Sequence, residues 1–281
     1  MNYLLPIASN KPNALDMRTK IIVLLAASFV LVLSSCRKEK ETPLDLDYTS
    51  ASDNSKAENV FNDMLLQVDN AVDANGLRDL CAPTVSFDTS ATPRTITVDF
   101  GNVNCTATNG RIRRGRIHVS YTGLYREPGT VITITPDNYH VNNILVQGTK
   151  TVTNLGPNAQ GQPTFSVVVN GTLTADDGSW TSTHQAQRVR TWLEGSNTAQ
   201  IDDDVYSITG NGSGVNRNGV AYTLTITNAL RVQVGCPWIM QGTVRITPTG
   251  RPEVTIDYGS GACDGNLSVT VNGTTYNVTI G

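Results

Sequence analysis

The sequence has few of the residues on which most enzyme and metal sites are built. Its three histidines, His118, His140 and His184, are scattered, and no HExxH pair is present. No CxxC pair is present either, which argues against a zinc site made from close cysteine pairs. The glycine-rich segment 210–214 lacks the strand-to-helix setting of a phosphate loop or nucleophile elbow. We therefore expect no metal, no cofactor and no catalytic residues, and we favour a protein that is not an enzyme.

Positive charge is also scarce. The chain has 21 Lys and Arg against 24 Asp and Glu, a formal net charge of −3. Residues 1–35 hold three of the basic and one of the acidic side chains, so the remainder carries a net charge of −5. This balance gives no indication of nucleic-acid binding.

The chain has one long apolar run, residues 21–33, and it is too short for a membrane-spanning helix, which needs about 20 residues. Arg18 and Lys20 precede it, as in a signal peptide. Met17 would begin a signal of ordinary length, so residues 1–16 are explained by an over-long start assignment. We interpret residues 1–35 as a signal peptide.

The end of this run, Leu33-Ser34-Ser35-Cys36, resembles the lipobox of bacterial lipoproteins. The resemblance implies lipidation of Cys36, cleavage before it, and anchoring by several acyl chains. The alternative is a signal peptide with a chance cysteine at its end. Arg37 at the next position implies, by the same resemblance, the outer membrane rather than the inner one. The RKEKE segment after Cys36 loosely resembles the export signals of Bacteroidota surface lipoproteins, so the expected location is the periplasmic face or the cell surface.

Residues 36–54 have little apolar periodicity and are predicted to be a tether. One β-rich domain is expected over 55–281, beginning with a helix over 55–76. Ser55 and Glu58 fit a capping box at its start, and Gly76 is placed to end it. The helix is predicted to be amphipathic, with an apolar stripe of Val60, Phe61, Met64, Leu65, Val68 and Val72.

From about residue 84 onward, apolar residues alternate with Thr, Asn or charged residues, which predicts strands with one buried face. The predicted strands include 139–146 as one strand. Tight turns are expected at the Asn-Gly and Asp-Gly pairs, namely 109–110, 170–171, 177–178, 211–212, 218–219 and 272–273. The predicted fold is therefore mainly β, a large antiparallel meander sheet or sandwich with one N-terminal helix.

Four cysteines remain besides Cys36, which suggests disulfides in an exported protein. The midpoint between Cys236 and Cys263 falls between Thr249 and Gly250, in a predicted hairpin turn. The midpoint between Cys81 and Cys105 is Pro93, also in a turn. Residues equidistant from a hairpin turn face each other, so we predict the disulfides Cys81–Cys105 and Cys236–Cys263. Free buried cysteines or a metal site are the alternatives.

Residues 236–280, with 203–219 before them, resemble the C-terminal half of β-rich lipoproteins common in Bacteroidota. The resemblance runs through most of the chain after Cys36. It implies the same fold and location, and it implies no activity, because no function is known for that family.

Two clusters of charge have alternative explanations. Four arginines lie in segment 111–117 and three acids in segment 201–206. They could pair across the sheet, or form separate anion and cation sites. Charges that protect sheet edges are the simpler explanation.

Three functions are compatible with these features. We favour first a structural or interaction protein of the cell envelope, with envelope proteins or glycans as partners. The second is a glycan-binding or other ligand-binding module that uses Trp180, Trp192 and Trp238, of which at least two must be exposed together. Packing of these rings in the core is the alternative. Trp180 and Trp192 are twelve residues apart, which puts both on one face of a single unbulged strand, but segment 179–195 is too long for one typical strand and a break is expected in it. The third is a hydrolase whose two carboxyls lie about 5 to 9.5 Å apart. Its candidate acids are Asp99, Asp177, Asp202, Asp203, Asp204, Glu194 and Asp257.

Overall fold

The structure is a computed structural model, and it describes residues 48–72, 81–108, 110–198, 200, 203–236 and 238–279. The predicted signal peptide, Cys36 and residues 37–47 of the predicted tether therefore lie outside the described residues. All described residues belong to the unit 46–281.

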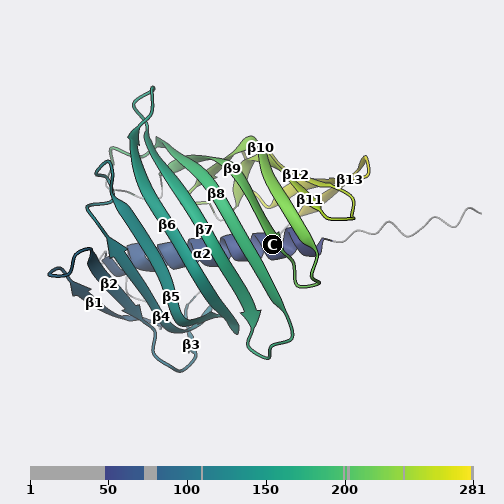
Figure 1. The fold of residues 1–281 in the computed structure, drawn as a ribbon. Helices are drawn as coiled ribbons and strands as arrows, with labels where there is room; N and C mark the ends of the chain where they lie inside the picture. Colours follow the sequence, from purple (N-terminus) through teal and green to yellow (C-terminus); the bar gives the residue numbers. More distant parts are fainter. Residues whose placement is uncertain are drawn as a thin grey trace, which may run out of the picture. The chain divides into compact units, whose positions relative to one another are not determined.

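One antiparallel sheet contains all the strands of this unit (Figure 1). The strands are β1 (Thr84–Asp88), β2 (Arg94–Asp99), β3 (Cys105–Thr106), β4 (Ile112–Tyr121), β5 (Val131–Val141), β6 (Ile144–Pro157), β7 (Pro163–Ala175), β8 (Thr181–Glu194), β9 (Val205–Val215), β10 (Ala221–Gln233), β11 (Ile239–Pro248), β12 (Val254–Ser260), β13 (Asn266–Val271) and β14 (Thr274–Thr279). Each strand pairs with its neighbours in sequence, except that β2 pairs with β4, and β3 pairs with β4 off the main path. The predicted mainly-β meander is confirmed, as a single sheet rather than a sandwich.

Buried and exposed side chains alternate along the strands as predicted, but one predicted strand is two strands in the structure. In β8, even-numbered residues from Ser182 to Arg188 are buried and the odd-numbered ones between them are exposed. The predicted strand 139–146 is instead divided by a tight turn at Asn142 and Asn143, whose φ angles are 52° and 59°. Asparagine tolerates this left-handed conformation, so two strands, β5 and β6, meet there.

Asn-Gly pairs do not all mark turns. The pairs 218–219 and 272–273, and Asp177-Gly178, do connect adjacent strands. The predicted turns at 170–171 and 211–212 are wrong, because both pairs lie inside strands, β7 and β9. Asn109 lies outside the described residues. At Gly171 the reason is packing: a Cβ there would lie 2.2 Å from the Phe61 ring, so only glycine lets that ring approach the sheet.

The helix α2 (Thr49–Val72) begins six residues earlier than predicted. Ser55 therefore lies inside the helix rather than at its start, and the expected end at 73–76 lies outside the described residues. The earlier start is explained by tertiary contacts, since Asn216 donates a hydrogen bond to Ser50 Oγ (2.9 Å) and the Arg217 amide donates one to Asp53 Oδ2 (2.7 Å). Among the described residues, no helix has both the length and the apolar character needed to cross a bilayer.

Helix α2 lies across the strands on the inner face of the sheet, the face that we define by its contact with this helix (Figure 1). Successive helix residues meet strands in reverse chain order: Asp53 meets the β9–β10 turn, Glu58 meets β8, Phe61 meets β7 and Asp63 meets β4. Its apolar residues Phe61, Met64 and Val68 are buried in the main core. A second core cluster lies along β10 to β13.

Both predicted disulfides are present. Cys81–Cys105 joins the segment before β1 to β3, with the Cα atoms 5.3 Å apart, and Cys236–Cys263 joins the segments before β11 and after β12, with the Cα atoms 5.9 Å apart. The pairing, which four cysteines alone would leave open, is thus confirmed.

Candidate functional site

The tryptophans do not form an exposed platform. Trp192 and Trp180 both face the inner side of the sheet, and Trp192 is only 3% exposed. The break expected in segment 179–195 is wrong, because Thr181–Glu194 forms the single strand β8. The Trp192 Nε1–H donates a hydrogen bond to Asp204 (3.2 Å), and the guanidinium of Arg126 lies 4.7 Å from its ring. The expected use of these residues for ligand binding is therefore wrong for Trp192, because β8 runs unbroken and turns its even positions toward α2.

Trp180 and Trp238 are each half-buried. The ring of Trp180 lies close to two cations, Arg217 at 4.4 Å and Lys56 at 5.1 Å. These contacts join the helix to the β9–β10 turn, so Trp180 contributes to the attachment of α2. Trp238 lies beside Cys236, at the start of β11.

Each candidate acid within the described residues accepts a hydrogen bond. Asp99 accepts from Arg116, Asp177 from Ser179, Glu194 from Arg231, Asp203 from Thr198, Asp204 from Trp192 and Tyr206, and Asp257 from Gly259. Burial raises the pKa of Asp204, although its hydrogen bonds from Tyr206 and Trp192 oppose that change. The hydrogen bond from Arg116 lowers the pKa of Asp99. Asp202 lies outside the described residues.

The arginines of segment 111–117 are not edge charges. Three of them lie in β4, which is between β2 and β5 in the sheet, and Arg111 directly precedes this strand, so the sheet-edge interpretation is wrong for the arginines. Arg111 and Arg113 bind Asp63 of α2, at 2.9 and 2.8 Å, while Arg114 binds Asp176 (2.6 Å) and Arg116 binds Asp99 (2.8 Å). Odd-numbered arginines thus hold the helix, and even-numbered ones lie on the opposite face.

A group of buried polar side chains fixes α2 on the inner face. Arg188 donates to Glu58 (2.6 Å), and Lys150 donates to Asn62 (2.8 Å) and to the Phe61 carbonyl (3.2 Å). Arg113 is 2% exposed; burial alone would lower its pKa, but the hydrogen bonds and charge of Asp63 raise it overall. These charges are therefore engaged in holding the fold.

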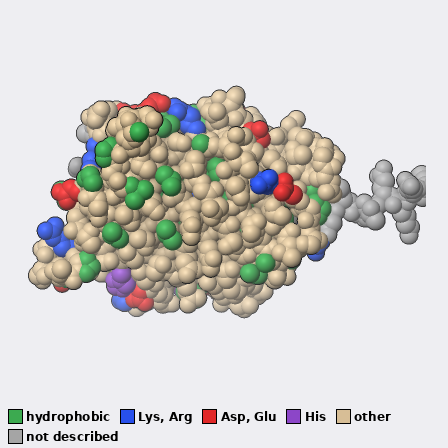
Figure 2. Space-filling model, turned by 45° about the horizontal axis from the view of Figure 1, so that its top comes forward, with side chains coloured by type: hydrophobic (Ala, Val, Ile, Leu, Met, Phe, Trp, Pro, Cys, Tyr) green, Lys and Arg blue, Asp and Glu red, His purple; other side chains and the backbone are tan. Residues whose placement is uncertain are grey.

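We call the opposite face of the sheet the outer face. Its centre differs from the inner face because its side chains there are uncharged. Its uncharged outward side chains in the centre of β6 to β10 form what we call the neutral patch: Gln147, Thr149, Thr151, Thr153, Ser166, Val168, Asn170, Thr172, Thr174, Thr183, Gln185, Gln187, Val189, Thr191, Ser207, Thr209, Asn211, Ser213, Val215, Ala221, Thr223, Thr225 and Thr227. Charge begins at its margin, where Arg231 of β10 lies opposite Ser207 and donates a hydrogen bond to Glu194 of β8. Figure 2 shows that most charged side chains lie toward the margins, while uncharged polar and scattered hydrophobic ones fill the middle.

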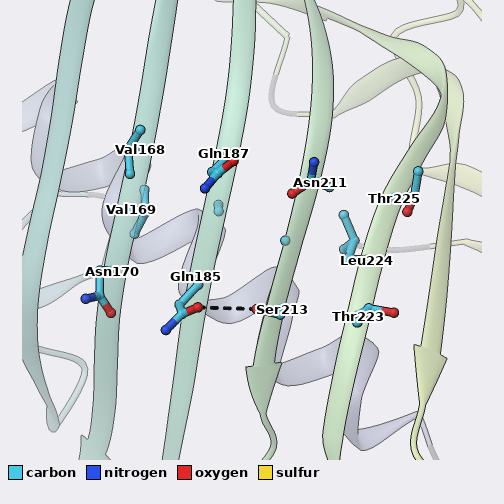
Figure 3. A pocket seen from close by; sticks show the side chains of 12 residues that line it. Val168, Val169, Asn170, Gln185, Gln187, Asn211, Ser213, Thr223, Leu224 and Thr225 are labelled. Atoms are coloured by element: carbon cyan, nitrogen blue, oxygen red, sulfur yellow. Dashed lines mark hydrogen bonds between the residues drawn. The ribbon is translucent and has the colours of Figure 1, made fainter.

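A shallow hollow of about 540 Å³ lies within the neutral patch (Figure 3). Two rows of side chains cross four strands there. Asn170, Gln185, Ser213 and Thr223 form one row, and Val168, Gln187, Asn211 and Thr225 form the next. Ser213 donates a hydrogen bond to Gln185 (3.4 Å). The four amides each offer donors and an acceptor, so the hollow can bind an uncharged ligand that carries several hydroxyl or amide groups.

No family model matches the chain, and neither a curated protein nor a solved structure was found to be similar to it. The resemblance to Bacteroidota lipoproteins therefore stays a prediction from the residues that suggested it.

The neutral patch could have been found from the sequence. Its signal is the absence of charge at the polar positions of alternating strands, as in the segments 166–174 and 207–215. The tryptophans fit a ligand site by residue type alone, because aromatic rings are common in such sites. A side chain is buried or exposed according to which face of its strand the helix covers. No local sequence pattern contains that information.

Proposed function

We propose that the chain is a lipid-anchored protein of the bacterial cell envelope that binds a partner and does not catalyse a reaction. Its anchor would be the acylated Cys36, at the outer membrane. Two disulfides support export, because they persist in oxidising compartments. The arrangement of a charged signal start, an apolar run and a lipobox supports the anchor.

The observation that carries the binding role is the contrast between the two faces of the sheet. The inner face carries α2, and its buried charges pair with that helix. The outer face presents the neutral patch, a wide hydrogen-bonding surface that makes no contact with α2 (Figure 1). A partner bound there would meet amides and hydroxyls without having to neutralise a charge.

Anchoring is tested by Cys36→Ala in a bacterial host that processes lipoproteins. We expect the full-length protein to incorporate labelled palmitate and to sediment with membranes. The Cys36→Ala protein should lose the label and appear in the soluble fraction. Ser35→Ala is the matched control, because it keeps a small residue before the cysteine and should stay anchored. Palmitate labelling that survives Cys36→Ala would refute the anchor.

Glycan binding is the second candidate, favoured by the amide rows of the hollow. Neutral sugars present adjacent hydroxyls that amide side chains can bind in pairs. A glycan array should show binding that is lost in the double variant Gln185→Ala, Asn211→Ala. Gln147→Ala, an outward amide of β6 outside the hollow, should keep it. Binding that is unaffected by the double variant would exclude the hollow as the site.

A further inference from the structure

The two edges of the sheet are built differently. At one edge, β1 has five residues, follows Pro83 and ends at Asp88. Short length, proline and charge are devices by which proteins prevent an edge strand from pairing with another chain. At the other edge lies β14 (Thr274–Thr279), which within the described residues has a partner strand, β13, on one side only.

Strand β14 is only one residue longer than β1, with six residues, but it lacks the other two protective features. Its sequence, TTYNVT, contains no charge and no proline. Its register with β13 is continuous from Val271↔Thr274 to Asn266↔Thr279, so no bulge turns it away from solvent. A regular, uncharged edge of this kind is a template for a further strand.

The inner side of β14 carries apolar side chains that an added strand would cover. Tyr276 lies opposite Val269, and Val278 lies opposite Leu267, so both continue the apolar side of the second core cluster. Val278 is 38% exposed. An added strand with apolar residues on the same side would cover it.

We propose that β14 pairs with β14 of a second copy of this chain, antiparallel and about a two-fold axis, so that two sheets become continuous. A two-fold axis places each residue opposite a symmetry-related position of the same strand. A charge near the axis would then face its own copy, which destabilises pairing. The uncharged strand meets this requirement, and its Tyr276 and Val278 would extend the apolar side into the partner.

The test uses the full chain with Cys36→Ser, so that lipid cannot hold two copies together. Sedimentation velocity should show a dimer that dissociates on dilution. Asn277→Lys, at an exposed position on the outer side of β14, should weaken dimerisation about tenfold or more through like-charge repulsion. Val278→Lys should do the same from the inner side. Ser86→Lys, the matched change on β1, should leave the dimer intact.

Hydrogen exchange gives a second readout that does not depend on a variant. Backbone amides of residues 274–279 should exchange more slowly in the concentrated dimer than in the diluted monomer, whereas amides of 84–88 should not change. A monomer at every concentration would overturn the proposal. A dimer that tolerates Asn277→Lys but is lost in Ser86→Lys would overturn it too, because it would place the contact at the other edge.

Discussion

At the residue scale, the surroundings of the buried His184 side chain favour its uncharged form. It is 2% exposed, and neither ring nitrogen has a hydrogen-bond partner. Its Nε2 lies 3.6 Å from Glu58, too far for a hydrogen bond. Burial lowers its pKa; Glu58 opposes that change, while Arg188 and Lys150 add to it. His184 is therefore neutral in the folded protein near neutral pH.

This environment predicts a specific loss of stability in acid. Because the folded-state pKa of His184 lies below its ordinary value of 6.5, the unfolded chain binds the proton first as the pH falls. The free energy of unfolding should decrease as the pH drops through about 6.5 toward the folded-state pKa. Urea titrations across this range should show a smaller decrease for His184→Leu than for the parent.

His118→Leu is the control for that experiment. The His118 side chain is 47% exposed, so His118→Leu makes the same exchange of residue types without removing a buried imidazole. An equal pH dependence in the parent and in His184→Leu would contradict the assignment of a buried neutral imidazole.

At the element scale, the position of α2 depends on charged contacts as well as on its apolar stripe. Arg113 of β4 donates to Asp63 through Nε (3.3 Å) and Nη2 (2.8 Å), and Arg111 binds the same carboxylate. Buried ion pairs add little net stability, but they fix geometry, and breaking one leaves an uncompensated charge. The pair therefore sets which part of the helix meets β4.

Removal of this carboxylate should be costly. Asp63→Ala leaves the buried guanidinium of Arg113 without its charge partner, and we expect a loss of about 3 to 5 kcal/mol in the free energy of unfolding, measured by denaturant titration. The double variant Asp63→Leu, Arg113→Met should recover much of that loss. Asp176→Ala, which breaks a more exposed pair with Arg114, should cost at most about 1 kcal/mol. Similar effects for the two acids would contradict the buried role of Asp63.

At the scale of the whole molecule, the sheet is continuous but its core is divided. The cluster under α2 spans β2 to β9, and the other lies along β10 to β13. The disulfide Cys236–Cys263 closes a loop around β11 and β12 with a sequence separation of 27. It therefore strengthens the part of the sheet that depends least on the helix.

Loss of that disulfide should destabilise the strands near it more than the rest of the sheet. Cys236→Ala with Cys263→Ala should lower the free energy of unfolding by about 3 kcal/mol, from the added entropy of the unfolded chain. Hydrogen exchange should increase in β11 to β13 more than in β6 to β8, because the latter pack against α2. The matched pair Cys81→Ala, Cys105→Ala should show its largest increase in β1 and β2 instead. An even increase over the whole sheet in both variants would contradict this division.

The sequence by itself determined the local features of this protein. Alternation of apolar residues determined the strands, and the position of Thr249-Gly250 and Pro93 in hairpin turns determined the cysteine pairing, because both depend on near neighbours along the chain. The apolar stripe determined the amphipathic helix. The capping-box pattern of Ser55 and Glu58 placed the helix start six residues too late, because Ser50 and Asp53 are held by residues of the distant β9–β10 turn.

Only the tertiary structure decided what each face of the sheet does. The path of α2 buries Trp192, converts Gly171 from an expected turn into a contact for Phe61, and directs Arg113 inward to Asp63. The same path leaves the amides of β7 to β9 on the outer face. A period of two in the sequence distinguishes the two sides of a strand, but the choice of the covered side belongs to contacts between residues far apart in the chain.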